Sequence, residues 1–184
     1  RDDIAQALKY EGLSELIISG IERGEIPIRV THNDTKINNI LFDRLSGEAV
    51  CVIDLDTVMP GSMLYDFGDA LRMGASTGAE DEVDLSKVEF DTEAFRQFAK
   101  GYLEEMREEL TEKEIELLPE SAAILTYECG IRFLTDYLNG DTYFKIKREN
   151  HNLDRARNQF KLVSDMEKNL DEMREIVKKY SQNA

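Results

Sequence analysis

Residues 31–43 read THNDTKINNILFD, a run of polar side chains that passes directly into the apolar Ile40-Leu41-Phe42. A tight turn uses Asn and Asp because their side chains hydrogen-bond to nearby backbone groups. A turn does not need a histidine, an aspartate and two asparagines at once. The surplus of polar groups indicates a loop with a second role, and the segments on either side of it decide the fold.

Short extended segments flank this loop. A helical pattern over about residues 4–21 is broken by Pro27, and residues 28–30 are then a candidate strand. Residues 37–42 and 49–55 are expected to form a hairpin, because turn-forming residues separate two apolar runs. Residues 65–73 are expected to form a short helix, and the small, acidic residues 74–84 are typical of a mobile loop.

The rest of the chain has helical periodicity. Three apolar stripes run from Phe95 to Leu110, from Ala123 to Leu138 and from Leu153 to Val177. Such stripes are typical of helices that pack on a core, and the last, about seven turns long, also suits a coiled-coil partner. The sequence predicts a mainly α, α+β fold in which helices surround a central β-hairpin.

Composition excludes several classes of partner. The 184 residues suit one domain, and 41% hydrophobic with 33% charged residues indicates a globular chain. The net charge of −15 repels nucleic acid and anionic membranes, and no run reaches the ~20 apolar residues of a membrane helix. Cys51 and Cys129 lack metal-ligand spacing, so we expect reduced thiols in a cytoplasmic protein. Small molecules are the expected partners.

Residues 31–39, the polar loop, also carry a pattern of residues that is typical of a catalytic site. His32, Asp34 and Asn39 fit H-x-D-x-x-x-x-N, the arrangement of a kinase catalytic loop, and Asp54 ends the next predicted strand. Phosphoryl transfer needs a carboxylate near the attacking hydroxyl and oxygen ligands for Mg²⁺. Asp34 would accept the hydroxyl proton, while Asn39 would face Asp54 across the hairpin and hold the metal ion. His32 is expected to brace the loop by hydrogen bonds.

A rival interpretation starts from Asp54. Residues 50–58 read VCVIDLDTV, an apolar strand followed by D-x-D-x-T, which looks like the nucleophile motif of haloacid-dehalogenase-type phosphatases. Asp54 would then attack a phosphate, Asp56 would act as acid and base, and Mg²⁺ would still be needed. Such an enzyme builds a parallel sheet, for which the helical patterns after Leu85 leave no room. A self-capped Asn/Asp-rich turn and a non-catalytic helical interaction module are further alternatives.

The amino-acid sequences of these motifs resemble those of a known family. THNDTKINNILFD, followed by VIDLDTVMPGSMLYDFGDALR at 52–72, resembles the aminoglycoside phosphotransferase and choline kinase superfamily, which shares its catalytic core with protein kinases. GIRFLTDYLNGDTYFK at 130–145 looks most like the N-acetylhexosamine 1-kinases. The resemblance implies a protein-kinase-like C-terminal lobe. It also implies transfer of the ATP γ-phosphate, with Mg²⁺, to the anomeric hydroxyl of N-acetylglucosamine or N-acetylgalactosamine; an aminoglycoside or choline-type acceptor is the alternative.

The same resemblance implies a role for each matching residue. These roles are the catalytic base for Asp34, metal ligands for Asn39 and Asp54, support of the loop for Asp66, and contact with the sugar for Arg132 and Tyr143.

The resemblance also implies a part that these residues do not include. Kinases of this kind have an N-terminal lobe that grips the nucleotide, and only 31 residues precede His32. We therefore expect residues 1–184 to be the C-terminal lobe, separated from the nucleotide lobe of the same polypeptide and inactive alone. Apolar surface around Ile28, Val30 and Val52 would then be exposed, so self-association is expected.

Four weaker signals have simpler explanations. Arg132 precedes Asp136 by four residues, so an exposed ion pair on a helix would explain it. Tyr143 could close the end of that helix. Lys36 is expected to be solvated, with contact to a phosphate as the alternative. Asp56 could assist the metal ion or hydrogen-bond the next turn.

Overall fold

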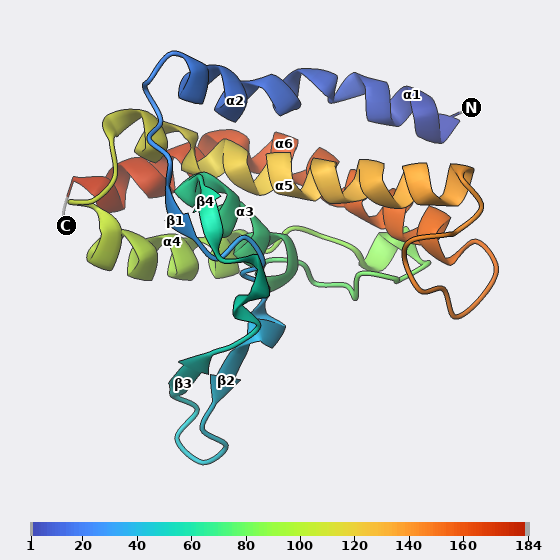
Figure 1. The fold of residues 1–184 in the computed structure, drawn as a ribbon, viewed down its shortest axis with the longest axis horizontal. Helices are drawn as coiled ribbons and strands as arrows, with labels where there is room; N and C mark the ends of the chain where they lie inside the picture. Colours follow the sequence, from blue (N-terminus) through green and yellow to red (C-terminus); the bar gives the residue numbers. More distant parts are fainter. Residues whose placement is uncertain (1, 183–184) are drawn as a thin grey trace.

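Two long antiparallel helices form the centre of the molecule. In the computed structural model, which describes residues 2–182, α5 (Glu112–Leu138) packs along α6 (His151–Ser181) (Figure 1). Helix α3 (Met63–Gly74) packs on α5, and α4 (Thr92–Met106) packs on α6. Helix α3 approaches α5 closely at Gly68, where a Cβ atom would lie 2.3 Å from the carbonyl oxygen of Ser121. The mainly α, α+β character predicted from the sequence is confirmed.

The three predicted apolar stripes lie on α4, α5 and α6 and face the core. Phe95 and Leu103 on α4 are completely buried, as are Leu118 on α5 and Met166 and Met173 on α6. Because burial of apolar surface is the main favourable term in folding, these contacts hold the four helices together. The stripe on α6 is covered by α4 and α5 of the same chain, so it does not serve the coiled-coil partner considered above.

The N-terminal segment forms two helices where the sequence pattern predicted one. Helix α1 (Asp2–Lys9) and helix α2 (Ser14–Glu22) are separated by a 3₁₀ turn at Glu11–Leu13, and both lie along α5 (Figure 1). Tyr10 is buried at this break, with its ring 6.3 Å from that of Tyr127. Gly12 follows, and glycine is a poor helix former. Burial of Tyr10 and the glycine together explain the interruption.

The strands form two separate antiparallel pairs. Strand β1 (Arg29–Thr31) pairs with β4 (Met59–Gly61), and β2 (Ile40–Phe42) pairs with β3 (Ala49–Val52). The sequence pattern missed β4 because it has three residues and Pro60 at its centre. Within residues 2–182 no strands run parallel, so the phosphatase alternative lacks the sheet on which its motif depends.

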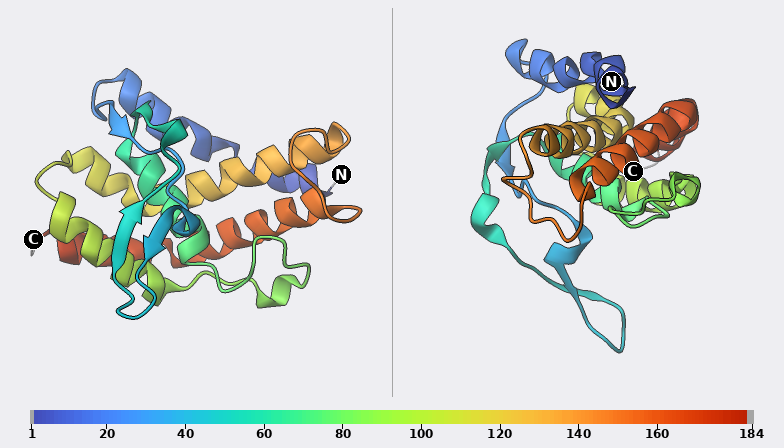
Figure 2. Two further views of the ribbon diagram at one scale, coloured as in Figure 1. Left: turned by 60° about the horizontal axis from the view of Figure 1, so that its bottom comes forward. Right: turned by 90° about the vertical axis from the view of Figure 1, so that its right-hand side faces the viewer.

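The β2–β3 hairpin does not lie at the centre of the fold, contrary to our expectation. It projects from the helical body, and all four residues of β3 are exposed (Figures 1 and 2). The reason is that its strands pair only with each other and no helix covers either face. The base of the hairpin nevertheless adjoins the polar loop, which places residues 31–39 between the hairpin and the helices.

None of the helices in the described residues is long and apolar enough to cross a membrane.

Candidate active site

The polar loop is fixed to helix α3 by Asp66. Its two carboxylate oxygens accept hydrogen bonds from the backbone N–H groups of His32 (2.8 Å) and Asn33 (2.7 Å). Asn33 has a φ of 62°, a left-handed conformation that Asn tolerates better than most residues. Asp66 was expected to support this loop, and it makes these contacts from the first turn of α3.

A second set of hydrogen bonds joins the loop to the strands. The Asn33 amide accepts from Thr31 Oγ1 at 2.9 Å and donates to the carbonyl oxygen of Thr57 at 3.0 Å. Gly61 on β4 faces this arrangement so closely that a Cβ atom there would lie 2.3 Å from Thr31 Oγ1 and 2.6 Å from Asn33 Oδ1. The close approach explains why position 61 needs glycine.

His32 bridges the loop and the end of β3. Its Nε2 lies 3.0 Å from the carbonyl oxygen of Ile53, so Nε2 carries the proton and donates. Thr57 Oγ1 donates to the carbonyl oxygen of His32 at 2.8 Å. One contact is made by the side chain and the other by the backbone, and both join the loop to residues that follow β3; the bracing role of His32 stays a prediction.

The Asp34 carboxylate is held by two donors. Asp34 Oδ2 lies 2.7 Å from Lys36 Nζ and 2.8 Å from Asn39 Nδ2, and the same Asn39 nitrogen donates to the Asp34 carbonyl oxygen at 2.8 Å. Burial acts to raise the pKa of Asp34, but the hydrogen bonds from Lys36 and Asn39 outweigh it and hold the pKa below its ordinary value. The carboxylate is therefore ionised at neutral pH. Lys36 is paired with Asp34, which corrects our expectation of a solvated lysine.

Asn39 and Asp54 both lie at the base of the β2–β3 hairpin, just outside its strands. The backbone N–H of Ile53 donates to the Asn39 carbonyl oxygen at 2.9 Å, and Asp54 is the next residue in the chain. Among the described residues no donor bonds to the Asp54 carboxylate or to Asn39 Oδ1, which leaves these hard oxygen atoms for a cation such as Mg²⁺. No group of three or more His, Cys, Asp or Glu side chains in the described chain forms a metal cluster. A bound Mg²⁺ would therefore need the amide oxygen, waters and phosphate oxygens as further ligands.

Asp56 lies in the 3₁₀ turn Leu55–Thr57 and is exposed. Within residues 2–182 its carboxylate has no hydrogen bond or ion pair, so the alternative in which it bonds to the next turn is wrong.

A cleft of about 1010 Å³ opens beside Asp34. The polar loop, α2, α3, α5, α6 and residues 143–145 line it, so it collects side chains that are far apart in the sequence. Asp34 and Lys36 share it with Arg132 and Tyr143, the two residues expected to contact a sugar. The residues expected to act in catalysis or to support the loop that do not line this cleft are His32, Asn39, Asp54, Asp56 and Asp66.

Arg132 does not pair with Asp136, contrary to the simpler explanation above. Its closest carboxylate is that of Glu128, at 3.5 Å and half exposed. Asp136 instead accepts from the backbone N–H groups of Thr142 (2.9 Å), Tyr143 (2.8 Å) and Phe144 (2.9 Å). Burial opposes ionisation of Asp136, but these bonds outweigh it and lower its pKa. Asp136 is thus the anchor of the loop that carries Tyr143.

Tyr143 does not close the end of a helix. Helix α5 ends at Leu138, Gly140 follows with a φ of 87°, and Tyr143 is 75% exposed at the mouth of the cleft. Its ring lies 4.8 Å from that of Phe144, edge to face.

The sequence patterns did not reveal several charged residues that line the cleft. Arg72 on α3 is only 8% exposed; its Nη1 lies 2.7 Å from Glu80 Oε1 and its Nε lies 3.1 Å from Asp69 Oδ1. An arginine directly after Leu71, on the buried face of an amphipathic helix, was the available signal. Burial raises the pKa of the neighbouring Cys129 thiol to about 12, so this cysteine is protonated and unreactive at neutral pH.

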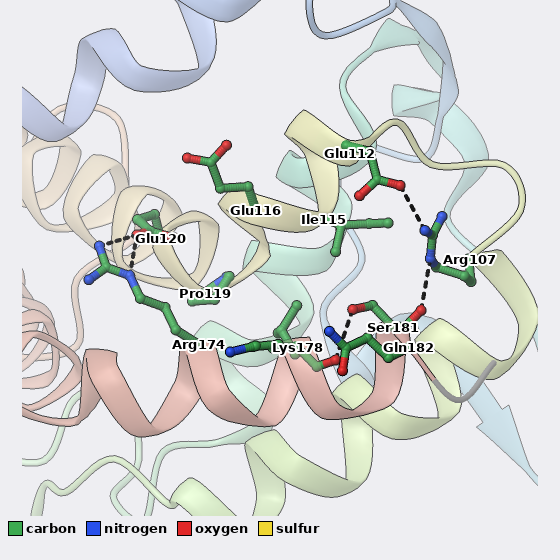
Figure 3. Close-up of a pocket in the computed structure, with 11 residues that line it drawn as sticks. Arg107, Glu112, Ile115, Glu116, Pro119, Glu120, Arg174, Lys178, Ser181 and Gln182 are labelled. Carbon is green, nitrogen blue, oxygen red and sulfur yellow. Dashed lines mark hydrogen bonds and ion pairs between the residues drawn. The ribbon is translucent and has the colours of Figure 1, made fainter.

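A smaller pocket of about 470 Å³ lies between α5 and the end of α6, apart from the polar loop (Figure 3). Its arginines are engaged: Arg107 bonds to Glu112 at 2.7 Å, and Arg174 bonds to Glu120 at 2.6 Å. It contains none of the residues expected to act in catalysis, so the larger cleft is the better candidate.

Comparison with protein families indicates the same class of reaction, phosphoryl transfer, as the residues of the polar loop. The family described as the Phosphotransferase enzyme family is matched over residues 9–112, more than half of the 184 residues. The matched range contains the polar loop, both strand pairs, α3 and α4, whereas Arg132 and Tyr143 lie beyond it.

Proposed function

This chain belongs to the Phosphotransferase enzyme family, and from that premise we propose that it is the acceptor-binding, protein-kinase-like lobe of an ATP-dependent kinase for N-acetylhexosamines. The observation that carries the proposal is the placement of Asp34. An ionised carboxylate, held by Lys36 and Asn39, opens into the same cleft as Arg132 and Tyr143. We propose that the acceptor's anomeric hydroxyl lies against Asp34 and receives the γ-phosphate of ATP.

Asp34 would act as the base. A carboxylate within hydrogen-bond reach of the hydroxyl accepts its proton as the oxygen attacks phosphorus. Lys36 would keep this carboxylate ionised, while Asn39 holds its rotamer through one hydrogen bond to Oδ2 and holds the backbone of Asp34 through a second bond to the carbonyl oxygen. Asn39 and Asp54 would hold Mg²⁺, which would neutralise phosphate charge when bound.

The charge of the cleft favours a neutral acceptor. Five cationic side chains line the cleft with four anionic ones: Lys36, Arg72, Arg132, Lys145 and Arg155 with Asp34, Asp69, Glu80 and Glu128. The chain as a whole carries −15, so the cleft differs in the sign of its net charge from the chain as a whole. A cationic aminoglycoside or choline would gain little from such a lining, whereas a sugar can hydrogen-bond to these polar groups.

The nucleotide-binding lobe is proposed to cover the exposed strands. Ile28, Val30 and Val52 are 52%, 76% and 53% exposed, as expected from the sequence, and Leu41 and Phe42 on β2 are also exposed. Large apolar side chains exposed on neighbouring strands are typical of an interaction site. We propose that another part of the same polypeptide packs there in a cytoplasmic enzyme and that residues 1–184 alone tend to self-associate through it.

An acceptor panel tests the function. The full-length protein is incubated with Mg-ATP and N-acetylglucosamine, N-acetylgalactosamine, glucose, choline or an aminoglycoside, and ³¹P NMR identifies the product. We expect an anomeric phosphate ester from the two N-acetylhexosamines. Phosphorylation of choline or an aminoglycoside alone would show that the acceptor has been misassigned, and no transfer to any acceptor would overturn the proposal.

A further inference from the structure

Arg155, on α6, lies in the cleft with most of its hydrogen-bonding capacity unused. Its Nη1 donates to Asn152 Oδ1 at 3.1 Å, which occupies one of the five N–H groups of the guanidinium. The nearest carboxylate oxygen, Glu80 Oε2, is 3.9 Å from Nε and therefore beyond hydrogen-bond distance. Arg155 Nε is buried and has no hydrogen-bond partner among the described residues.

The neighbouring Arg72 provides the contrast. It lines the same cleft, yet its guanidinium bonds to Asp69, Glu80 and Gln159. Its charge and its donors are therefore satisfied inside the protein, as is usual for a buried arginine. Burying a donor without an acceptor is unfavourable, so the state of Arg155 requires an explanation that Arg72 does not.

Arg155 is also held in a fixed place. Its guanidinium lies over the ring of Phe133 at 5.2 Å, and Arg132 lies over the ring of Phe144 at 5.5 Å. These two rings are 4.7 Å apart, so the two arginines flank one aromatic pair on the wall of the cleft. A guanidinium stacked on an aromatic face keeps the N–H groups at its edge available for a ligand.

The same polar network orients Arg155 and the loop of Tyr143. Asn152, which accepts from Arg155, donates to Asp136 Oδ2 at 2.9 Å and to Asp141 Oδ1 at 2.8 Å. Asp136 in turn anchors the backbone of Tyr143. Arg155 and Tyr143 thus take their positions from one set of contacts, as two parts of a single binding surface would.

We propose that Arg155 is a specificity-determining residue that donates hydrogen bonds to the amide carbonyl oxygen of a neutral acetamido sugar. This inference rests on the proposed function, because it assigns a ligand atom within the same acceptor cleft. A carbonyl oxygen only accepts hydrogen bonds, which complements a guanidinium that only donates. An amino sugar is disfavoured because its ammonium would be repelled by the guanidinium of Arg155. A sugar with a carboxylate is disfavoured because that group would be repelled by Glu80.

The test compares two variants with a matched control in the full-length protein. Arg155→Met keeps an unbranched stem over Phe133 but removes all donors, and Arg155→Lys keeps the charge without the planar fork. Arg157→Met is the control, because Arg157 is also on α6 but pairs with Asp3 and is absent from the cleft lining. The measurements are the KM for N-acetylglucosamine, glucose and ATP, the kcat for each sugar, and the melting temperature.

We expect the KM for N-acetylglucosamine to rise about 10-fold or more in Arg155→Met, as for loss of a charged hydrogen bond, with kcat and the KM for ATP nearly unchanged. The preference for N-acetylglucosamine over glucose should fall in parallel, which a purely structural role would not produce. If Arg155→Met does not fold, Arg155→Lys decides through the same measurement, the loss of preference for N-acetylglucosamine over glucose. Wild-type activity with an unchanged sugar preference in the variants overturns the role of Arg155 alone. Absence of wild-type activity on all acceptors overturns both proposals.

Discussion

Asn39 Nδ2 lies 2.8 Å from both the side-chain carboxylate and the backbone carbonyl oxygen of Asp34. One amide group therefore fixes the rotamer and the backbone of the proposed base together. Within residues 2–182 the amide oxygen of Asn39 accepts no hydrogen bond. The side-chain nitrogen of Asn39 thus holds the proposed base, while its side-chain oxygen is a proposed metal ligand. This double use explains why Asp34 and Asn39 need a defined spacing in the sequence.

Asp34→Asn is expected to abolish most turnover while the fold is retained. The new amide can still accept from Asn39 but cannot take up the hydroxyl proton, and loss of a general base costs about 10²–10⁴-fold in rate. Steady-state kinetics with N-acetylglucosamine and a melting curve measure the two effects. A variant that retains near-normal kcat would remove Asp34 from the mechanism.

The pH dependence of Asp34 is expected to shift when Lys36 is replaced. The pKa of Asp34 is held below its ordinary 3.8, so the ionised base persists as pH falls and is lost only when pH passes through the lowered value. The stability that the pair contributes is present above the ordinary pKa and is lost over the same acidic range. Lys36→Met removes the closest cation, so the pKa of Asp34 should rise.

The acid limb of kcat/KM in Lys36→Met should therefore move to higher pH than in the wild type, as measured by a pH–rate profile. Lys145→Met, which removes another cation of the cleft, is the control and should leave the limb in place. Coincident acid limbs for Lys36→Met and the wild type would show that Lys36 does not set this pKa.

The grouping of polar side chains in the loop could be predicted from the sequence because it is local, whereas their catalytic roles stay predictions. His32, Asp34 and Asn39 are close in the chain, and the residue types themselves indicate what they can do. The helical stripes were predictable for the same reason, since periodicity is a local property. Strand β4 was not, because three residues with a central proline carry almost no strand signal.

The cleft beneath the loop could not be predicted in the same way. Arg72 on α3 and Arg155 on α6 are neighbours only because both helices pack on α5, and no sequence pattern joins them. The simpler explanation that paired Arg132 with Asp136 was wrong, because it rested on helical spacing alone. The chain turns back after Gly140, and three backbone N–H groups reach the carboxylate instead. Tertiary contacts decided these positions.

Asp136→Ala is expected to weaken acceptor binding by releasing the loop of Tyr143. Three backbone N–H groups and the Asn152 amide would lose their acceptor, so the melting temperature should fall and the KM for the sugar should rise. Asp171→Ala, at a side chain that is 99% exposed on α6, is the matched control and should change neither. Equal effects of the two substitutions would contradict this assignment.

Gly61→Ala is expected to displace the polar loop, although Gly61 itself does not line the cleft. The added methyl group would meet Thr31 Oγ1 and Asn33 Oδ1 well inside contact distance, and such overpacking costs about 1–3 kcal/mol in the free energy of unfolding. Activity should fall with stability. Gly101→Ala in α4 is the control, because nothing lies within 4 Å of its Cβ position, and replacing a helical glycine there should stabilise the protein by about 0.5–1 kcal/mol. Chemical denaturation measures both values.

Mg-ATP is expected to bind the 184-residue chain no more tightly than about 1 mM, a free energy of about −4 kcal/mol. The physical reason is the small number of phosphate contacts near Asp34: Lys36 is already paired with that carboxylate, and the proposed metal ligands are Asn39 and Asp54. A triphosphate is normally gripped by several backbone N–H groups and cations, which in a kinase come largely from the second lobe. Calorimetric titration of the chain with Mg-ATP measures the affinity, and the full-length protein is the comparison. Micromolar binding by the 184-residue chain would mean that the nucleotide site lies within these residues, in which case the exposed strands β1 and β3 would need a different partner.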